Sequence, residues 1–222
     1  MIEINEIFTD SDKRLALWCD SVIDTNDLAG MADYVIQNDM HLISVPPELV
    51  YSIWTYLEHS NVDILTRFVL SPESDIDSCI YDLAQKITSV CKKGAKGVQI
   101  FMKMRDFEKF AEKISVVRDD LFFGHDLCVG IDAQDLDMQQ LPMVFEKLCN
   151  MRVNAFALTL NEDKKNRSDF VGRIYGILQN WNLECELHFI LGNNFDRMDQ
   201  AIRLVESEKP ELLSRLRFFL DY

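Results

Sequence analysis

Polar side chains that can support acid–base or nucleophilic chemistry follow several short apolar segments of this sequence. They are Asp20, Ser44, Ser71, Lys103, Arg105, Asp132, Asp135, Thr159, Asn161, His188, Asn193 and Asn194. A lysine amine can form a Schiff base with a carbonyl compound, and a histidine can act as a general base near neutral pH. The Walker, GxGxxG, GxSxG and HExxH motifs are absent, so nothing favours a P-loop, Rossmann or serine-hydrolase site.

Three of these groups allow two interpretations each. Arg67 lies inside the apolar segment ILTRFVL, where it needs a partner such as Asp20 or Asp132, either as a structural ion pair or as a substrate clamp. His188 is a candidate general base or a hydrogen-bonded core histidine. Asp132 and Asp135 could bind magnesium together with Asp20, or they could cap the helix that follows.

Strand-like and helix-like segments alternate along the whole chain. The strand candidates are ALWCDSV, HLISV, DILTRFVL, GVQIFMK, LCVGID, NAFALTL, CELHFIL and RLRFFLD. Several are apolar on both faces, as in a covered parallel sheet, and amphipathic segments with helical period such as 75–91 lie between them. Their starts are 22 to 34 residues apart, which is the length of one βα unit.

Eight such units predict a compact (β/α)8 TIM barrel, formed by residues 1–222 as a single domain. Seven strands would instead favour a doubly wound open sheet, and the segment PELLSRLRFFLDY is compatible with an eighth strand or with a terminal helix. In a barrel, the carboxyl ends of the strands carry the chemistry, so the polar residues above are expected to converge there.

Composition narrows the partners of the protein. The 222 residues carry a formal charge of −14, which disfavours nucleic acid and anionic lipid surfaces. The sequence has no apolar run of membrane-spanning length and no signal-peptide core. Its six cysteines contain no CxxC pair and its four histidines are scattered, so we expect reduced thiols in a cytoplasmic protein with no metal site and no cofactor. A small-molecule metabolite is the expected partner, and a homodimer is possible if apolar helix faces remain uncovered.

Four stretches resemble the deoxyribose-phosphate aldolase branch of the class I aldolase barrels. They are HLISVPPELV at 41–50, FVLSPESDID at 68–77, KKGAKGVQIFM at 92–102 and LCVGIDAQDL at 127–136. Their order and spacing match the second to fifth strands of that family. The resemblance implies a TIM barrel that binds a small carbonyl or phosphorylated metabolite.

The resemblance also implies that the family's Schiff-base machinery is missing. The position of the catalytic lysine corresponds to Leu158, and that of the lysine that tunes it lies near Phe189. The acid of the fourth strand corresponds to Gln99, and the relay lysine of the fifth strand to Cys128. No lysine occurs in 148–163 or 166–208, so a shift of register does not restore either of the first two lysines.

Other family positions carry over in part. Ser44 replaces a cysteine on the second strand, and Asp20 on the first strand is retained. Gly192 and Asn193 lie where the family binds phosphate, beside Asp196, which would repel it. Lys103, expected at the end of the fourth strand, is either a relocated Schiff-base amine or a solvated lysine.

Two hypotheses follow for the function. In the first, an aldolase-like barrel binds a small metabolite, with Asp20, Lys103, Asp132 and His188 as candidate catalytic residues and Ser44, Arg67, Gln99, Gly192 and Asn193 as candidate binding residues. In the second, the barrel is a non-catalytic binding or assembly module whose mouth is filled by Leu158, Phe189 and Phe101. A polar pocket at the strand ends would favour the first hypothesis, and a plugged mouth the second.

Overall fold

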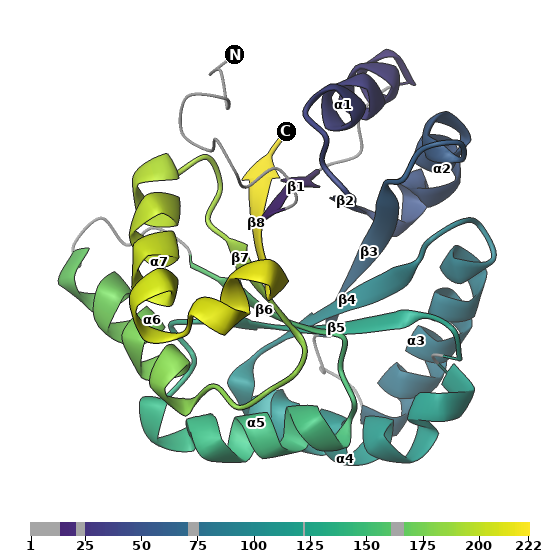
Figure 1. The fold of residues 1–222 in the computed structure, drawn as a ribbon. Helices are drawn as coiled ribbons and strands as arrows, with labels where there is room; N and C mark the ends of the chain where they lie inside the picture. The colour runs from purple at the N-terminus through teal and green to yellow at the C-terminus, as the bar shows by residue number, and fades with distance from the viewer. Residues whose placement is uncertain (1–13, 21–24, 71–75, 122, 161–166) are drawn as a thin grey trace.

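The chain forms a closed barrel of eight parallel strands surrounded by helices (Figure 1). The structure is a computed structural model that describes residues 14–20, 25–70, 76–121, 123–160 and 167–222. The strands are β1 (Leu15–Trp18), β2 (Leu42–Val45), β3 (Asp63–Leu70), β4 (Gly97–Met102), β5 (Asp126–Asp132), β6 (Ala155–Thr159), β7 (Glu186–Ile190) and β8 (Leu216–Asp221). The last segment is therefore a strand, which confirms the (β/α)8 barrel over the open sheet.

A helix follows each of the first seven strands. The helices are α1 (Thr25–Gln37), α2 (Val50–Leu57), α3 (Ile76–Cys91), α4 (Met104–Leu121), α5 (Leu141–Asn150), α6 (Arg167–Asn180) and α7 (Phe195–Glu208). Three short 3₁₀ segments, η3 (Pro47–Leu49), η4 (Met138–Gln140) and η5 (Pro210–Arg215), join these elements. None of the helices in the described ranges is long and apolar enough to cross a membrane.

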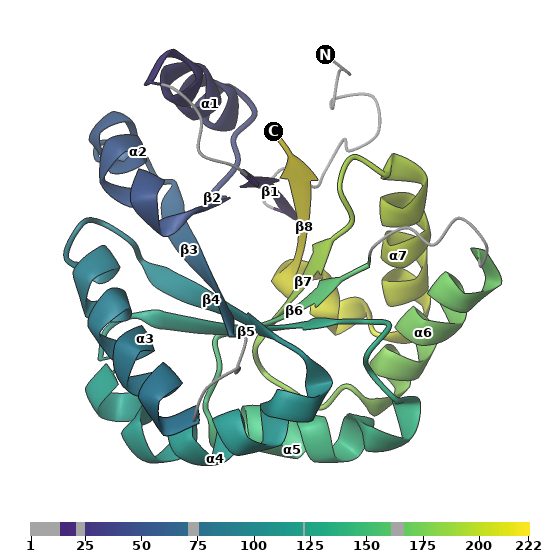
Figure 2. The same ribbon diagram turned by 180° about the vertical axis from the view of Figure 1, so that it is seen from behind.

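Each strand pairs with the next one along the chain, and β8 closes the ring by pairing with β1. In this last pair, Leu15 is opposite Phe218 and Trp18 is opposite Asp221. Figures 1 and 2 show β8 beside β1, with the C-terminus close to this seam. Closure therefore places the first and last strands of the chain side by side, with their carboxyl ends at the same rim of the barrel.

The core has two parts because successive side chains on a strand point to opposite faces. The outward side chains pack against the helices in one large cluster that includes Phe107, Phe110, Phe145, Phe156 and Phe218. A smaller cluster lies inside the barrel and consists of Ala16, Trp18, Cys128, Ala155, Ala157, Ile190 and Phe219, with Leu42 and Phe101 packed against it. Much of the barrel interior is therefore filled with side chains and is not an open channel.

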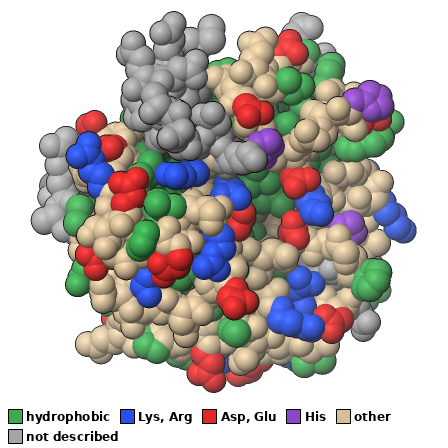
Figure 3. Space-filling model, viewed as in Figure 1, with side chains coloured by type: hydrophobic (Ala, Val, Ile, Leu, Met, Phe, Trp, Pro, Cys, Tyr) green, Lys and Arg blue, Asp and Glu red, His purple; other side chains and the backbone are tan. Residues whose placement is uncertain are grey.

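The outer surface mixes charges of both signs. Figure 3 shows Lys and Arg side chains interspersed with Asp and Glu over the face seen in Figure 1. Ion pairs such as Arg152–Asp119 at 2.6 Å and Arg203–Asp199 at 2.8 Å lie on this exposed surface. Such exposed pairs contribute little to stability, so the fold depends on the two apolar clusters.

Candidate functional site

Two cavities adjoin the carboxyl ends of the strands, where barrels carry their chemistry. The larger has a volume of about 850 Å³ and lies between β1, β8 and the β7–α7 loop. The smaller has a volume of about 420 Å³ and lies over β3, β4 and β5. Trp18, Asp20 and Thr159 line both cavities. We therefore treat them as one mouth with two lobes.

Arg67 on β3 is one of three basic residues that line the smaller lobe. Its guanidinium lies 4.2 Å from the centre of the Trp18 ring, which is cation–π distance. Its Nη2 donates to the carbonyl oxygen of Cys19 and lies 3.5 Å from Oδ1 of Asp20, while the indole N–H of Trp18 also donates to Asp20. Burial lowers the pKa of Arg67, and the charge of Asp20 opposes this effect. These contacts fix the guanidinium, and its buried Nη1 has no hydrogen-bond partner among the described residues.

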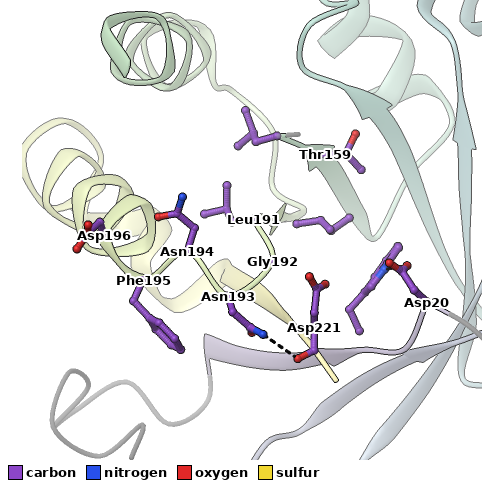
Figure 4. A pocket seen from close by; sticks show the side chains of 12 residues that line it. Asp20, Thr159, Leu191, Gly192, Asn193, Asn194, Phe195, Asp196 and Asp221 are labelled. Atoms are coloured by element: carbon purple, nitrogen blue, oxygen red, sulfur yellow. Dashed lines mark hydrogen bonds between the residues drawn. The ribbon is translucent and has the colours of Figure 1, made fainter. Parts of the chain in front are cut away.

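Asp221, at the end of β8, adds a second carboxylate to this rim. Burial raises the pKa of Asp221, the negative charge of Asp20 raises it further, and Arg67 acts in the opposite direction. Figure 4 shows Asp221 lying between Asp20 and the loop that carries Gly192 and Asn193. The mouth thus holds two electrostatically coupled carboxylates beside one fixed guanidinium, which could orient the oxygens and hydroxyls of a small ligand.

An aromatic plug closes the barrel below the mouth. The Trp18 ring meets Phe101 edge to face at a centroid distance of 5.6 Å and Phe219 at 5.8 Å. Gly130 makes room for it, because a Cβ at that position would lie 2.2 Å from the Phe101 ring. Trp18 is only 7% exposed. The plug separates the mouth from the polar groups deeper in the barrel.

Below the plug lies a chain of buried polar side chains. Ser44 donates to Oε1 of Gln99 at 2.5 Å. On the other side, Cys128 Sγ lies 3.8 Å from Nδ1 of His188, whose Nε2 lies 2.9 Å from Oε2 of Glu186. Burial lowers the pKa of His188, against the opposing effect of Glu186, and burial raises the pKa of Cys128 well above its ordinary value.

Glu186 connects this chain to the opposite end of the barrel, where Arg217 donates to its other oxygen. Burial alone would raise the pKa of Glu186, but the hydrogen bond from His188 and the charge of Arg217 lower it overall. The thiol, the imidazole and the carboxylate thus lie in the spatial order found in enzymes that use a cysteine nucleophile. Here burial raises the pKa of the thiol and the plug covers it, so the arrangement is a buried polar layer and not an accessible nucleophile.

The structure divides the residues selected from the sequence between these two layers. Of the nine candidate catalytic and binding residues, six line the mouth: Asp20, Arg67, Lys103, Asp132, Gly192 and Asn193. Three lie in the sealed interior: Ser44, Gln99 and His188, each at most 1% exposed. Ser71 and Asn161 lie outside the described residues. The carboxyl-end position expected for His188 is replaced by a buried one, because β7 continues for two more residues to Ile190.

The contacts of Arg67 and Asp132 bear on the alternatives that the sequence leaves open for these residues. Arg67 pairs with Asp20, whereas Asp132 accepts a hydrogen bond from the backbone N–H of Gln134 at 2.9 Å, as a turn-forming side chain does. Among the described residues, no group of three or more His, Cys, Asp or Glu side chains is placed to hold a metal ion. Lys103 is exposed and lines the smaller cavity.

Leu158 and Phe189 differ from the sequence expectation. Both were expected in the mouth, but both are fully buried in the outer cluster between strands and helices. Their neighbours Ala157 and Ile190 belong to the inner cluster instead. The expected register on β6 and β7 was therefore wrong by one residue. Of the proposed plug, only Phe101 lies where it was expected.

Trp18 and Asp221 are among the residues of the mouth that were not selected from the sequence. Trp18 was overlooked because it belongs to an apolar strand, although a bulky aromatic residue just before Asp20 is a signal of a closed mouth. Asp221 was overlooked because it is the second-last residue. The pairing of Trp18 with Asp221 across the β1–β8 seam brings both to the rim.

Comparison with known proteins gives a likeness in structure but not in sequence. No protein-family model matches the chain, and no curated protein matches it. The aldolase QR15 superposes with a TM-score of 0.70 at 10% identity, covering 95% of this chain and 91% of its own. The tetrameric deoxyribose phosphate aldolase of Aeropyrum pernix gives 0.66 at 10% identity, with coverages of 97% and 89%. A candidate deoxyribose-phosphate aldolase of Coccidioides immitis gives 0.68 at 9% identity, with coverages of 96% and 82%.

These matches define the class of fold. The protein is an aldolase-like (β/α)8 barrel whose structural neighbours include deoxyribose-phosphate aldolases. At about 10% identity the likeness is one of fold, and a barrel of this class supports many different reactions. The function must therefore be argued from the residues of the mouth.

Proposed function

We propose that the mouth binds a small carbonyl-bearing or phosphorylated metabolite, and that Schiff-base lyase chemistry at the centre of the barrel has been lost. The observation that carries the proposal is the guanidinium of Arg67, which lines the smaller lobe and is fixed there by Trp18 and Asp20. A guanidinium at the wall of a cavity can donate to the oxygen of a ligand. Asp20 and Asp221 could then accept hydrogen bonds from ligand hydroxyl groups.

The loss of Schiff-base chemistry is supported by the inward positions of β6 and β7. On these strands Ala157, Thr159, His188 and Ile190 face the interior or the mouth. None of them can form an imine with a carbonyl compound, since that step needs an unprotonated amine. Among the described residues that line the two lobes, Lys103 is the only lysine.

The aromatic plug favours a second candidate function, a non-catalytic binding or assembly barrel. Trp18, Phe101 and Phe219 block access to the only buried histidine among the described residues. A barrel of this kind would bind its ligand in the mouth without turning it over. The two candidates share the binding site and differ in whether a covalent intermediate forms.

Borohydride trapping distinguishes the candidates. The protein is incubated with glyceraldehyde or 2-deoxyribose 5-phosphate, reduced with borohydride and weighed intact. We expect no adduct above the level of the denatured protein, because no lysine faces the barrel centre among the described residues. A single adduct on Lys103, absent from a Lys103→Arg variant, would instead show that the Schiff base has moved to the smaller lobe and that the proposed loss is wrong.

Association and cellular location belong to the same proposal. We propose a homodimer, supported by exposed aromatic rings on the outer helices, such as Tyr51 on α2 at 58% and Tyr81 on α3 at 65% exposure. A particle of twice the chain mass of 25.8 kDa in solution would support it. We also propose a cytoplasmic location, supported by six cysteines that all remain free thiols.

A further inference from the structure

The β7–α7 loop forms the wall of the larger lobe that faces Asp221. Gly192 has a φ of 60°, and a Cβ there would lie 2.8 Å from Oδ2 of Asp221. The open side of this glycine therefore faces a carboxylate. A side-chain carboxylate already occupies the space in which a glycine loop would otherwise admit an anionic ligand group.

The polar side chains of this loop are already engaged. Asn193 donates through Nδ2 to the backbone oxygen of Asp221 at 3.2 Å (Figure 4). Asn194 accepts from the backbone N–H of Arg197 at 3.2 Å and so caps the start of α7. The guanidinium of Arg197 donates to the carbonyl of Leu160 at 3.4 Å and lies 5.2 Å from the Phe170 ring centre. Arg197 is not one of the residues that line the lobe.

Among the described residues that line the larger lobe, the charged side chains are all acidic. Its described lining residues include the carboxylates of Asp20, Asp196 and Asp221 and no lysine or arginine. The basic residues that line the mouth, Arg67, Lys103 and Arg105, border the smaller lobe. A doubly charged phosphate beside Asp221 would be repelled at short range, whereas a hydroxyl group would find acceptors.

We infer that the ligand end held between Asp221 and the β7–α7 loop is an unphosphorylated, hydroxyl-bearing end, and that Asp221 determines this specificity. The inference deepens the proposed function and rests on it, since it selects among small carbonyl metabolites. The preferred ligand is thus an unphosphorylated polyhydroxy aldehyde or ketone. Asp221 acts as an acceptor for its terminal hydroxyl and as a barrier to the phosphate ester of the same compound.

A matched pair of compounds tests the inference on the unmodified protein. Binding of 2-deoxyribose and of 2-deoxyribose 5-phosphate is measured by calorimetry at one ionic strength and at pH 7.5. We expect the free sugar to bind about tenfold more tightly than its phosphate ester. This comparison decides the inference even if a variant fails to fold. A phosphate ester that binds as tightly as the free sugar, or more tightly, would overturn it.

Two variants test whether Asp221 causes this difference in affinity. Asp221→Asn keeps the shape of the side chain and removes its charge, so it should strengthen binding of the phosphate ester. The difference in affinity between the two compounds should then be about threefold or less. Asp199→Asn is the matched control, because Asp199 lies on α7 in an exposed pair with Arg203 and does not line either lobe. This control variant should keep the tenfold difference in affinity between the two compounds. If the difference in affinity narrows equally in both variants, the role of Asp221 is overturned. If neither compound binds, the proposed function itself is overturned.

Discussion

Replacement of Trp18 by alanine is expected to lower the free energy of unfolding by about 3–5 kcal/mol, as large-to-small changes at buried aromatic positions do. The side chain is 7% exposed and contacts Phe101 and Phe219 inside the barrel. It also supports the guanidinium of Arg67 at 4.2 Å. The variant therefore loses both packing and the surface that fixes this guanidinium. Urea unfolding followed by circular dichroism measures the loss.

The same variant should open the sealed layer of the barrel. In the unmodified protein Cys128 is 1% exposed beneath the plug, whereas Cys149 is exposed. Labelling of the native protein with a small thiol reagent, followed by peptide mass analysis, should therefore mark Cys149 and spare Cys128. In Trp18→Ala we expect Cys128 to be labelled at least about tenfold faster, because reaction requires access as well as the thiolate. Equal labelling of Cys128 in the two proteins would contradict the plug.

The second large effect concerns His188. His188→Leu should lower the free energy of unfolding by about 3 kcal/mol, because it leaves the partly buried carboxylate of Glu186 without one of its hydrogen-bond donors. His188→Gln is the matched control, since its amide can still donate toward Glu186, and it should cost clearly less. If the two variants lose the same stability, the hydrogen bond from Nε2 is not what stabilises this layer.

The change of stability with pH tests the role of His188 independently. Burial lowers the pKa of His188 in the folded protein, whereas a histidine in the unfolded chain titrates near pH 6.5. Below that pH the unfolded state takes up a proton that the folded state does not. Stability therefore falls as pH decreases, by up to about 1.4 kcal/mol per pH unit for this one group. His188→Gln should show a smaller loss between pH 7 and pH 5.

Glu186 acts in a lower pH window. Its folded pKa is lowered overall by His188 and Arg217, so its contribution is present above the ordinary carboxyl range near pH 4.3 and is lost as pH falls below it. A decrease in stability that begins near pH 6.5 therefore reports on histidine. One that begins only below pH 5 reports on carboxylates.

The barrel could be predicted from the sequence because its signals are local and repeat. Apolar strands alternate with amphipathic helices at intervals of 22 to 34 residues, which is the length that one βα unit requires. The eighth strand was ambiguous because the segment PELLSRLRFFLDY is compatible with a strand and with a terminal helix. The structure shows a 3₁₀ turn over Pro210–Arg215 followed by a strand over Leu216–Asp221.

The direction of each side chain was harder to predict. Strand β6 is apolar on both faces, so an alternating pattern does not mark its inward residues. On β7 the polar residues Glu186 and His188 alternate with Leu187 and Phe189, and this signal was not used. As a result Leu158 and Phe189 were expected in the mouth, where Thr159 and Ile190 lie instead. On β3 and directly after β4 a basic residue interrupts the apolar pattern, and these residues, Arg67 and Lys103, line the smaller lobe.

The contacts that define the two layers were not accessible from the sequence. Cys128 and His188 are 60 residues apart, and Asp20 and Asp221 are about two hundred apart. Only closure of the barrel brings such pairs together, and no local motif marks them. The acidic lining of the larger lobe, which underlies the proposed ligand preference, is likewise a property of the fold.

The most direct test of the account follows the indole N–H signals of the three tryptophans by NMR during titration with 2-deoxyribose. Trp18 lines both lobes of the mouth, whereas Trp54 lies on α2 and Trp181 packs against Phe145 outside the strands. Binding in the mouth predicts a saturable shift of the Trp18 signal, with the signals of Trp54 and Trp181 unchanged. A Trp18 signal that stays constant at saturating ligand, or shifts of Trp54 or Trp181 alone, would contradict the claim that this mouth is the binding site.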